Sequence, residues 1–320
     1  MTSKIEEKLR RSARELLEQG KIGTFVGYEA GSLKFTTTPL ITKDKQATEC
    51  LVINPFIINN LSTYLREISG KIGVVAKGCD SRSIVSLIQD KQIARENVVI
   101  IGVPCAGIID LDKIEKLTGK DRDELDDIVR EGDKVTITFG SAKKEFPAKD
   151  VLIDSCLGCD QHIPKEYDIL LDEDSPAICD NEAGRSLIKE LEAMPPAQRW
   201  EFWKKQFERC IRCYACRQVC PACYCKRCFV EETEPRWVSP LPKWQDNLIF
   251  QVTRMMHVAG RCTDCGACER ACPAGIPLHS LSKKMAEIVD GLFEYKSGTD
   301  KDALPLMAAY ESKEAEDLIR

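Results

Sequence analysis

The chain has few histidines, few aromatic residues and no long hydrophobic run. It contains only 3 His in 320 residues, and aromatic residues make up 7%. The most apolar stretch, residues 97–109, contains Gly, Pro and Cys and is shorter than the roughly 18 residues of a membrane-spanning helix. Residues 1–11 lack the apolar segment of a secretory signal. We therefore expect a cytoplasmic protein without a membrane span, in which thiols stay reduced.

An excess of positive charge is also missing. The chain has 46 Lys+Arg against 51 Asp+Glu, which gives a net charge of −5 and does not support nucleic-acid binding. The sequence contains no Walker A motif, no GxGxxG after a strand, no nucleophile elbow and no HExxH. These absences argue against phosphoryl transfer and hydrolysis.

Cysteine, in contrast, is abundant. The chain has 17 Cys, an odd number that cannot all pair as disulfides, and eleven of them lie between Cys210 and Cys272. Clustered cysteines in a reducing compartment indicate metal binding more often than disulfides.

The first part of the chain has the pattern of an α/β domain. Short apolar runs typical of buried strands alternate with segments of helical periodicity. The predicted strands are 22–28, 71–76 and 97–103, and the predicted helices are 4–18, 57–68 and 81–90. Residues 134–147 predict a hairpin with Gly140 and Ser141 in its turn. This alternation favours a parallel or mixed sheet with helices packed on it, which we assign to residues 1–195.

The second part of the chain, residues 196–320, is expected to be mainly helical. Met194, Pro195 and Pro196 interrupt a helical pattern at its start. Amphipathic periodicity predicts helices over 196–210, 244–257 and 278–293.

Two cysteine runs in the second part share one spacing. They are Cys210-x2-Cys213-x2-Cys216-x3-Cys220-Pro221 and Cys262-x2-Cys265-x2-Cys268-x3-Cys272-Pro273. In this pattern one tight loop supplies three thiolates to a [4Fe-4S] cube, and the cysteine before proline binds the other cube. The spacing therefore predicts a two-cluster ferredoxin-like domain with crossed fourth ligands. The first cluster takes Cys210, Cys213, Cys216 and Cys272, and the second takes Cys262, Cys265, Cys268 and Cys220.

The alternative metal for these runs is zinc. Zinc ribbons usually have two CxxC pairs or Cys/His mixtures, whereas each run here holds four cysteines and ends in Cys-Pro. The pattern favours iron–sulfur clusters in both runs, and zinc remains an alternative only for an additional metal site. Three more cysteines follow the first run, namely Cys223, Cys225 and Cys228. They could be free thiols, extra ligands of a cluster, or three ligands of another metal site whose fourth ligand is Cys179 or Cys50.

The first run lies in a locally basic segment. Residues 200–229 contain two Glu and seven basic residues, Lys204, Lys205, Arg209, Arg212, Arg217, Lys226 and Arg227. Cations near an anionic cube raise its reduction potential and lower the cost of burying it. The alternative is a solvated basic surface.

Four further cysteines in the first part follow predicted strands or tight turns. Cys79 and Cys105 each follow a predicted strand, and Cys156 and Cys159 form a CxxC pair. Such loops meet at one crevice in α/β sheets, so these four residues predict a third [4Fe-4S] cluster. The alternative is a set of buried structural cysteines, and Cys50 and Cys179 are substitutes for a misplaced member.

Three segments of the first part resemble a known family. KGCDSRS, IIGVPCAGIID and CLGC-x4-P-x3-DI are similar to segments of the beta subunits of deazaflavin (coenzyme F-420) hydrogenases and formate dehydrogenases. The resemblance covers roughly residues 50–172, with a ferredoxin-like domain appended. It implies FAD and [4Fe-4S] clusters, with Cys79, Cys105, Cys156 and Cys159 as ligands.

One departure from this family concerns the flavin. The glycine-rich GGxxTALL-like segment is missing, and a charged helix and a short GYEAGS turn stand in its place. We therefore expect the isolated subunit to lack tightly bound FAD. Lys77 and Arg82 beside a helix start are the candidates for a phosphate or flavin contact.

These features predict an iron–sulfur electron-transfer subunit of a soluble multi-subunit redox complex. The expected partner is a formate dehydrogenase, a hydrogenase or a heterodisulfide-reductase-like flavoprotein, and no nucleic acid. One alternative is a flavin-dependent oxidoreductase subunit that reduces deazaflavin or NAD(P), and another is a scaffold whose clusters are only structural.

Overall fold

The computed structural model describes residues 4–173, 180 and 182–308, and the chain divides into two compact units. The first unit comprises Met1–Ser81 and Ile93–Arg185, and the second comprises Arg82–Gln92 and Ser186–Arg320. Helix α2 (Gly78–Gln89) begins in the first unit, and its residues from Arg82 onward belong to the second. The predicted domain boundary at residues 195 and 196 stays a prediction.

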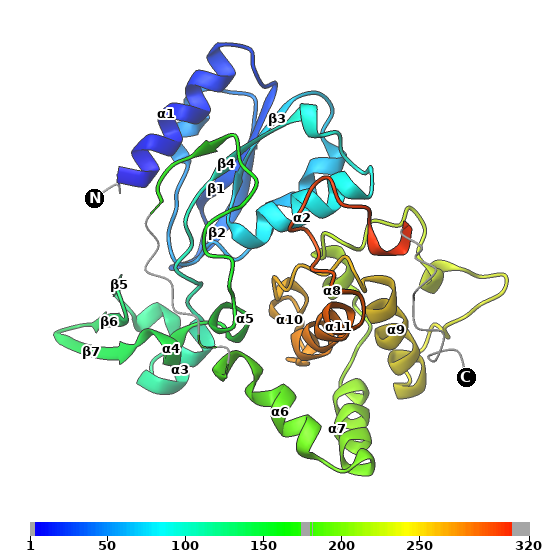
Figure 1. Cartoon of the computed structure of the whole chain (residues 1–320). Helices are drawn as coiled ribbons and strands as arrows, with labels where there is room; N and C mark the ends of the chain where they lie inside the picture. Colours follow the sequence, from blue (N-terminus) through cyan, green and yellow to red (C-terminus); the bar gives the residue numbers. More distant parts are fainter. Residues whose placement is uncertain (1–3, 174–179, 181, 309–320) are drawn as a thin grey trace. The chain divides into compact units, whose positions relative to one another are not determined.

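A five-stranded mixed sheet forms the centre of the first unit (Figure 1). Its strand order is β2-β1-β3-β4-β8, in which β1 and β2 are antiparallel and the other pairs are parallel. The strands are β1 (Thr24–Ala30), β2 (Thr37–Thr42), β3 (Ile72–Ala76), β4 (Val98–Gly102) and β8 (Ile169–Leu170). All five residues of β3 are buried, as expected for a central parallel strand.

The predicted α/β class and most of its elements are confirmed. The three predicted strands correspond to β1, β3 and β4, the helix predicted over 4–18 is α1 (Lys4–Glu18), and that over 81–90 lies in α2. The α-helix predicted over 57–68 is wrong, because only a 3-10 helix, η2 (Leu61–Glu67), forms there. Asn60 is extended and accepts hydrogen bonds from the backbone nitrogen and hydroxyl of Ser62, which starts a tighter turn.

A small antiparallel sheet completes the first unit. It consists of β5 (Asp127–Glu131), β6 (Lys134–Phe139) and β7 (Ala142–Pro147) in that order. The predicted hairpin over 134–147 is confirmed, with Gly140 at a φ of 58° in the turn. The helices of this part are α3 (Leu111–Thr118), α4 (Ala148–Val151) and α5 (Asp154–Leu157), and their core includes Ile114, Val135, Ile137, Val151 and Leu152.

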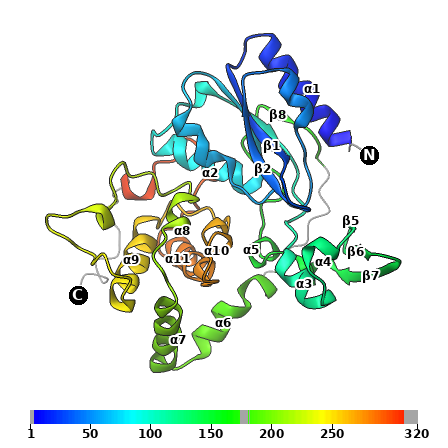
Figure 2. The same ribbon diagram turned by 180° about the vertical axis from the view of Figure 1, so that it is seen from behind.

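The second unit is helical, as predicted. Its helices are α6 (Ser186–Ala193), α7 (Pro196–Glu208), α8 (Ala215–Gln218), α9 (Trp244–His257), α10 (Ala267–Arg270) and α11 (Leu278–Phe293). Figure 2 shows these helices from behind. Pro195 precedes α7 and Pro196 is its first residue, a position where proline loses no hydrogen bond. Helix α9 packs against α7 and α11.

Short 3-10 helices connect the longer elements. They are η1 (Gln46–Cys50), η3 (Arg95–Asn97), η4 (Arg122–Glu124), η5 (Ala183–Arg185), η6 (Phe229–Glu231) and η7 (Leu306–Ala308). Within the described part of the chain, every helix is too short or too polar to cross a membrane.

Candidate iron–sulfur centres

The two cysteine runs of the second unit repeat the same backbone conformation 52 residues apart. Helix α8 begins after Tyr214 and α10 after Gly266, with φ angles of 61° and 67°. Two residues earlier, Arg212 and Asp264 also have positive φ angles, of 53° and 61°. Non-glycine residues in this left-handed region are uncommon and are concentrated at functional sites. Each run therefore makes the same tight loop before its short helix.

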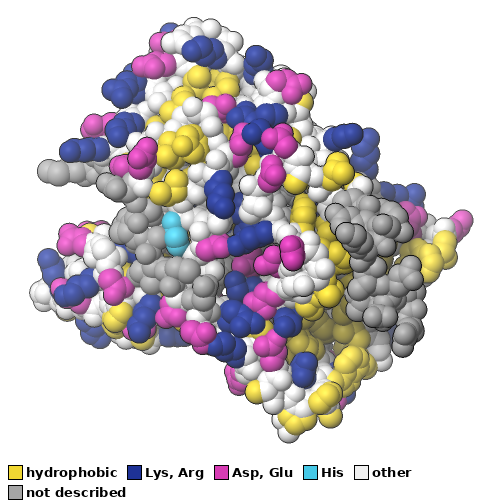
Figure 3. All heavy atoms as spheres, viewed as in Figure 1, with side chains coloured by type: hydrophobic (Ala, Val, Ile, Leu, Met, Phe, Trp, Pro, Cys, Tyr) yellow, Lys and Arg dark blue, Asp and Glu magenta, His cyan; other side chains and the backbone are white. Residues whose placement is uncertain are grey.

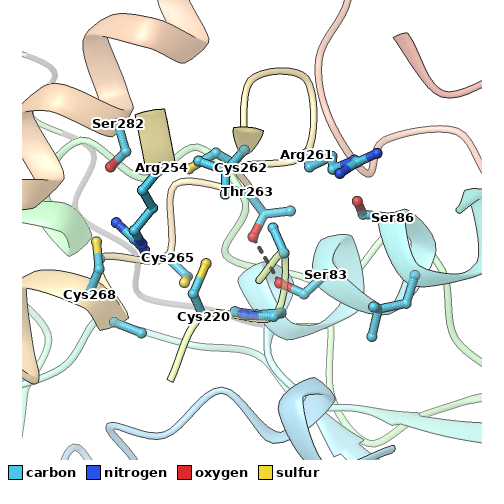
Figure 4. A pocket seen from close by; sticks show the side chains of 16 residues that line it. Ser83, Ser86, Cys220, Arg254, Arg261, Cys262, Thr263, Cys265, Cys268 and Ser282 are labelled. Atoms are coloured by element: carbon cyan, nitrogen blue, oxygen red, sulfur yellow. Dashed lines mark hydrogen bonds between the residues drawn. The ribbon is translucent and has the colours of Figure 1, made fainter. Parts of the chain in front are cut away.

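Each of two pockets in the second unit is lined by cysteines of both runs. One pocket is lined by Cys210, Cys213, Cys216 and Cys272, and the other by Cys220, Cys262, Cys265 and Cys268. Each pocket thus combines the first three cysteines of one run with the last cysteine of the other. Figure 4 shows the second pocket, into which the sulfur atoms of Cys220, Cys265 and Cys268 point.

Without a metal, burial favours the neutral form of the thiols that line the two pockets. Burial raises the pKa of Cys216 and of Cys268 to about 11, and it raises the pKa of Cys262 still further. Neighbouring thiols of the other run add to these shifts, Cys268 acting on Cys216 and Cys220 acting on Cys268. Metal coordination reverses this preference, because a metal-bound thiol is deprotonated. The donor set therefore fits an iron–sulfur cluster.

The choice between a cube and zinc rests on the spacing of the cysteines. In a [4Fe-4S] cube each thiolate binds a different iron atom, so its ligands are spread around a larger centre. Each run holds four cysteines and ends in Cys-Pro, a spacing that favours a cube over mononuclear zinc.

Helix α9 directs three buried polar side chains at these loops. Asn247, Gln251 and Arg254 are spaced four and three residues apart and therefore share one helix face, and they are only 0%, 1% and 3% exposed. Asn247 Nδ2 donates to the carbonyl oxygens of Phe207 and Cys210, both at 2.8 Å. The sequence predicted this helix correctly but did not predict the role of these residues, whose only signal is their spacing.

Two more contacts join this face of α9 to the first run. Gln251 Nε2 lies 3.9 Å from the sulfur atoms of both Cys210 and Cys216. Arg254 Nη2 donates to the carbonyl oxygen of Cys216 at 2.9 Å. The polar face is therefore fitted to the loop that surrounds the first pocket.

The opposite face of α9 is hydrophobic and exposed. Ile249, Val252 and Met256 are 46%, 44% and 62% exposed, and Trp200 of α7 is 49% exposed. Figure 3 shows hydrophobic side chains gathered over the region of α7 and α9. Soluble helices normally bury their apolar face and expose their polar one. The buried face of α9 is mixed, because it carries Phe250 and Met255 beside the three polar residues, while apolar residues are left exposed on the opposite face.

The loop of the second run is held by α11. Asp264 Oδ1 lies 2.6 Å from His279 Nε2, and Asp264 Oδ2 lies 2.8 Å from Lys283 Nζ. Burial alone would raise the pKa of Asp264, but His279 and Lys283 hold it below its usual value. Burial opposes protonation of His279, yet Asp264 outweighs burial and raises the pKa of His279. This buried ion-pair network fixes the loop between Cys262 and Cys265.

Most of the basic residues predicted to surround the first run have other partners. Arg209 and Arg212 donate to the carbonyl oxygens of Ala274 and Leu241. Ion pairs join Arg217 to Glu231 at 2.7 Å and Arg227 to Glu232 at 3.0 Å. Lys204 lies over the ring of Trp244 at 5.6 Å. These contacts favour a structural and surface role for these cations.

In the first unit, the parallel pairing of β3 and β4 places two cysteines at one sheet edge. Ala76 is registered with Gly102, and Cys79 and Cys105 each lie three residues beyond this pair. Gly78 allows close packing here, since a Cβ atom at that position would lie 1.8 Å from the carbonyl oxygen of Gln161.

The CxxC segment lies next to Cys105. The backbone nitrogen of Cys105 donates to the carbonyl oxygen of His162 at 2.8 Å. Burial raises the pKa of Cys105 to about 11 and that of Cys159 to about 12, and Cys156 contributes to both shifts. The structure therefore brings Cys105, Cys156 and Cys159 together, and it places Cys79 at the helix start packed against Gln161.

The remaining described cysteines are Cys50, Cys223, Cys225 and Cys228. Cys50 is exposed at the end of η1, and Cys225 is exposed as well. Cys223 lies beside Cys220 and Arg254, and these contacts lower its pKa, the hydrogen bond with Cys220 contributing most. Cys228 precedes η6. Cys179, predicted as an alternative ligand, lies outside the described residues.

Lys77 and Arg82 are both engaged in buried contacts. Lys77 Nζ contacts Asp80 Oδ2 at 2.8 Å, the carbonyl oxygen of Asn59 at 3.0 Å and the Tyr28 hydroxyl. Arg82 donates to the carbonyl oxygens of Ser297 and Thr263. Their predicted phosphate or flavin contact stays a prediction.

Comparison with known proteins agrees with these centres. Residues 206–276 match the family described as the 4Fe-4S dicluster domain, so the second unit carries such a domain. The match includes both cysteine runs. The chain is therefore an iron–sulfur protein.

The particular similarity is to subunits of formate dehydrogenases. The F420-dependent formate dehydrogenase subunit beta of Methanocaldococcus jannaschii is 28% identical over 74% of this chain and 76% of that protein. The F420-dependent formate dehydrogenase 1 subunit beta of Methanococcus maripaludis is 28% identical over 77% of each chain. A solved chain of the F420-reducing [NiFe] hydrogenase complex from Methanosarcina barkeri is 12% identical, covers 63% of this chain and 88% of its own, and has a TM-score of 0.42. The resemblance indicated by the sequence motifs is confirmed.

Proposed function

We propose that this protein is an iron–sulfur electron-transfer subunit of a redox complex, with two [4Fe-4S] clusters held by crossed ligands. A bound cube supplies one-electron transfer, and the protein determines its position and potential. The observation that carries the proposal is the lining of the two pockets, each with three cysteines of one run and the fourth of the other. Cys272 accordingly binds the first cluster, and Cys220 binds the second.

A third [4Fe-4S] cluster is proposed in the first unit. The support is the joint position of Cys105, Cys156 and Cys159, since Cys156 contributes to the raised pKa of both Cys105 and Cys159, together with the placement of Cys79 at the same sheet edge. Cys79 completes a set of four thiol ligands. Three cubes would let the chain accept and donate electrons one at a time at separate positions.

The proposed partner is another redox subunit of the formate dehydrogenase or hydrogenase type. The support comes from the relatives, which are named as beta subunits of F420-dependent formate dehydrogenases. The isolated subunit is proposed to lack tightly bound FAD, because the glycine-rich segment of the family is missing.

The test is iron, sulfide and flavin quantification on the anaerobically purified full chain, with two variants. We expect about twelve irons per chain, four for each cube, and no stoichiometric FAD. Cys156→Ser with Cys159→Ser should remove about four irons. Cys272→Ala should disturb the cluster of Cys210, Cys213 and Cys216.

Cys50→Ser, at an exposed cysteine, is the matched control and should leave iron content unchanged. A wild-type protein without iron after reconstitution would contradict the proposed function. Damage in Cys272→Ala restricted to the cluster of Cys262, Cys265 and Cys268 would contradict the crossed assignment. Stoichiometric FAD would instead favour a flavin-dependent oxidoreductase subunit.

A further inference from the structure

Arg254 is a buried cation whose contacts are incomplete. It is 3% exposed, its Nη2 donates to the carbonyl oxygen of Cys216, and its side chain also hydrogen-bonds to the Cys223 thiol. Its Nε and Nη1 atoms are also buried and have no hydrogen-bond partner among the residues that the structure describes. An unsatisfied buried N–H of a charged group costs free energy, so a group that accepts these hydrogen bonds is expected.

The position of Arg254 indicates what that acceptor is. Its side chain lines the pocket of Cys220, Cys262, Cys265 and Cys268, and Figure 4 shows its guanidinium extending toward the sulfur atoms of Cys265 and Cys268. Through Cys216 the same side chain is fixed to the loop of the other pocket. Arg254 therefore lies where both cysteine sets can be reached by one guanidinium.

We propose that Arg254 donates hydrogen bonds to the cluster in the pocket of Cys220, Cys262, Cys265 and Cys268, and so raises its reduction potential above that of the other cluster. The inference rests on the proposed crossed ligand sets. Four thiolates make a cube anionic, and reduction makes it more negative, so a nearby cation stabilises the reduced form more than the oxidised form. Arg254 thus determines in which of the two clusters an added electron is more stable.

Arg261 provides a matched control in the same pocket. It also lines the pocket, and its Nε is likewise buried without a hydrogen-bond partner in the described structure. Unlike Arg254, however, Arg261 forms an ion pair with Asp90, with Nε 3.4 Å from Asp90 Oδ2, and its guanidinium lies 5.4 Å from the ring centre of Tyr224. Its charge is therefore partly neutralised by a carboxylate. Arg261→Gln removes the same formal charge as Arg254→Gln without removing the proposed contact.

The experiment is a redox titration of the full chain, followed by electron paramagnetic resonance, for wild type, Arg254→Gln, Arg254→Lys and Arg261→Gln. Arg254→Gln should keep its iron and shift one cluster at least tenfold toward the oxidised form at fixed potential, about 59 mV for one electron. Arg254→Lys keeps the charge and should restore most of the potential while changing the line shape. Arg261→Gln should shift much less.

The outcomes separate this inference from the proposed function. Full iron content with unchanged potentials in Arg254→Gln would overturn the inference and leave the two clusters in place. Equal shifts of the reduction potential in Arg254→Gln and Arg261→Gln would also overturn it, because they would indicate that any nearby positive charge has the same effect without a hydrogen bond to the cluster. If Arg254→Gln fails to retain iron, Arg254→Lys decides: retained clusters near the wild-type potential support the inference, and lost clusters contradict it.

Discussion

Two buried polar networks of this protein, one in each unit, differ in how completely their hydrogen bonds are satisfied. In the first unit, Lys77, Asp80 and Tyr28 are 1%, 0% and 0% exposed and form a closed network. Asp80 Oδ2 receives hydrogen bonds from the backbone nitrogen of Lys77 at 3.1 Å and from the Tyr28 hydroxyl at 3.2 Å. Burial opposes protonation of Lys77, but Asp80, Tyr28 and Cys79 together outweigh burial and raise the pKa of Lys77, so this lysine stays charged.

In the second unit, the buried face of α9 forms an open network. Gln251 Oε1 and Arg254 Nε and Nη1 are buried without partners in the described structure. Closed networks stabilise and specify a fold, whereas unpaired buried groups are costly and require an explanation. The difference indicates that the first network is structural and that the second is built for a group bound between the cysteines.

Breaking the closed network should have the largest effect on stability. Lys77→Met leaves the buried carboxylate of Asp80 without its cation, and removing one partner of a buried ion pair costs about 3–5 kcal/mol. We expect a loss of this size in the free energy of unfolding, measured by anaerobic denaturant titration. The matched substitution Lys134→Met breaks an exposed pair with Glu145 and should cost less than about 1 kcal/mol. Similar losses in both variants would refute the structural role of the closed network.

A substitution in the open network should change the stability of the fold little and the properties of the first cluster more. Gln251→Met keeps the side-chain length and removes a buried oxygen that has no partner in the described structure, so we expect the free energy of unfolding to change by less than about 1 kcal/mol. The same variant removes the amide near Cys210 and Cys216 and should shift the resonance signal and lower the potential of the first cluster. An unaltered resonance signal together with a large loss in the free energy of unfolding would mean that Gln251 has a structural role, like the residues of the closed network.

Sequence patterns predicted the elements that depend on local composition. The apolar runs of β1, β3 and β4 were sufficient because these strands are buried at the centre of the sheet. Strand β2 was not predicted, since it is half-exposed, contains Pro39 and exists by antiparallel pairing with β1. The 3-10 helix η2 was mistaken for an α-helix, because apolar spacing does not show how Asn60 bonds to Ser62.

The candidate site could be predicted only in part for a similar reason. The spacing of the two cysteine runs identified the candidate ligands, because ligand spacing is local along the chain. The contributions of Gln251 and Arg254 depend on which face of α9 is turned toward the loops, and this is determined by tertiary packing. Composition pointed instead to residues such as Arg217, whose described partners are Glu231, the Cys228 thiol and the ring of Tyr214.

The second unit also contains a closed network, formed by His279, Asp264 and Lys283, and its disruption is expected to have the smallest effect. His279 faces Asp264, Glu269 and Lys283; burial and Lys283 oppose its protonation, but Asp264 and Glu269 outweigh them and raise its pKa. A raised pKa means that protonated His279 stabilises the folded state fully below its unfolded pKa of about 6.5, and that this contribution is lost as pH rises through the folded pKa. His279→Gln should therefore lower the unfolding midpoint more at pH 6 than at pH 9. In an Asp264→Asn background the effect of His279→Gln should lose this pH dependence, because the carboxylate that raises the pKa is absent. Equal losses at both pH values in the otherwise native chain would mean that His279 does not change its charge between pH 6 and pH 9, and would contradict this pH dependence.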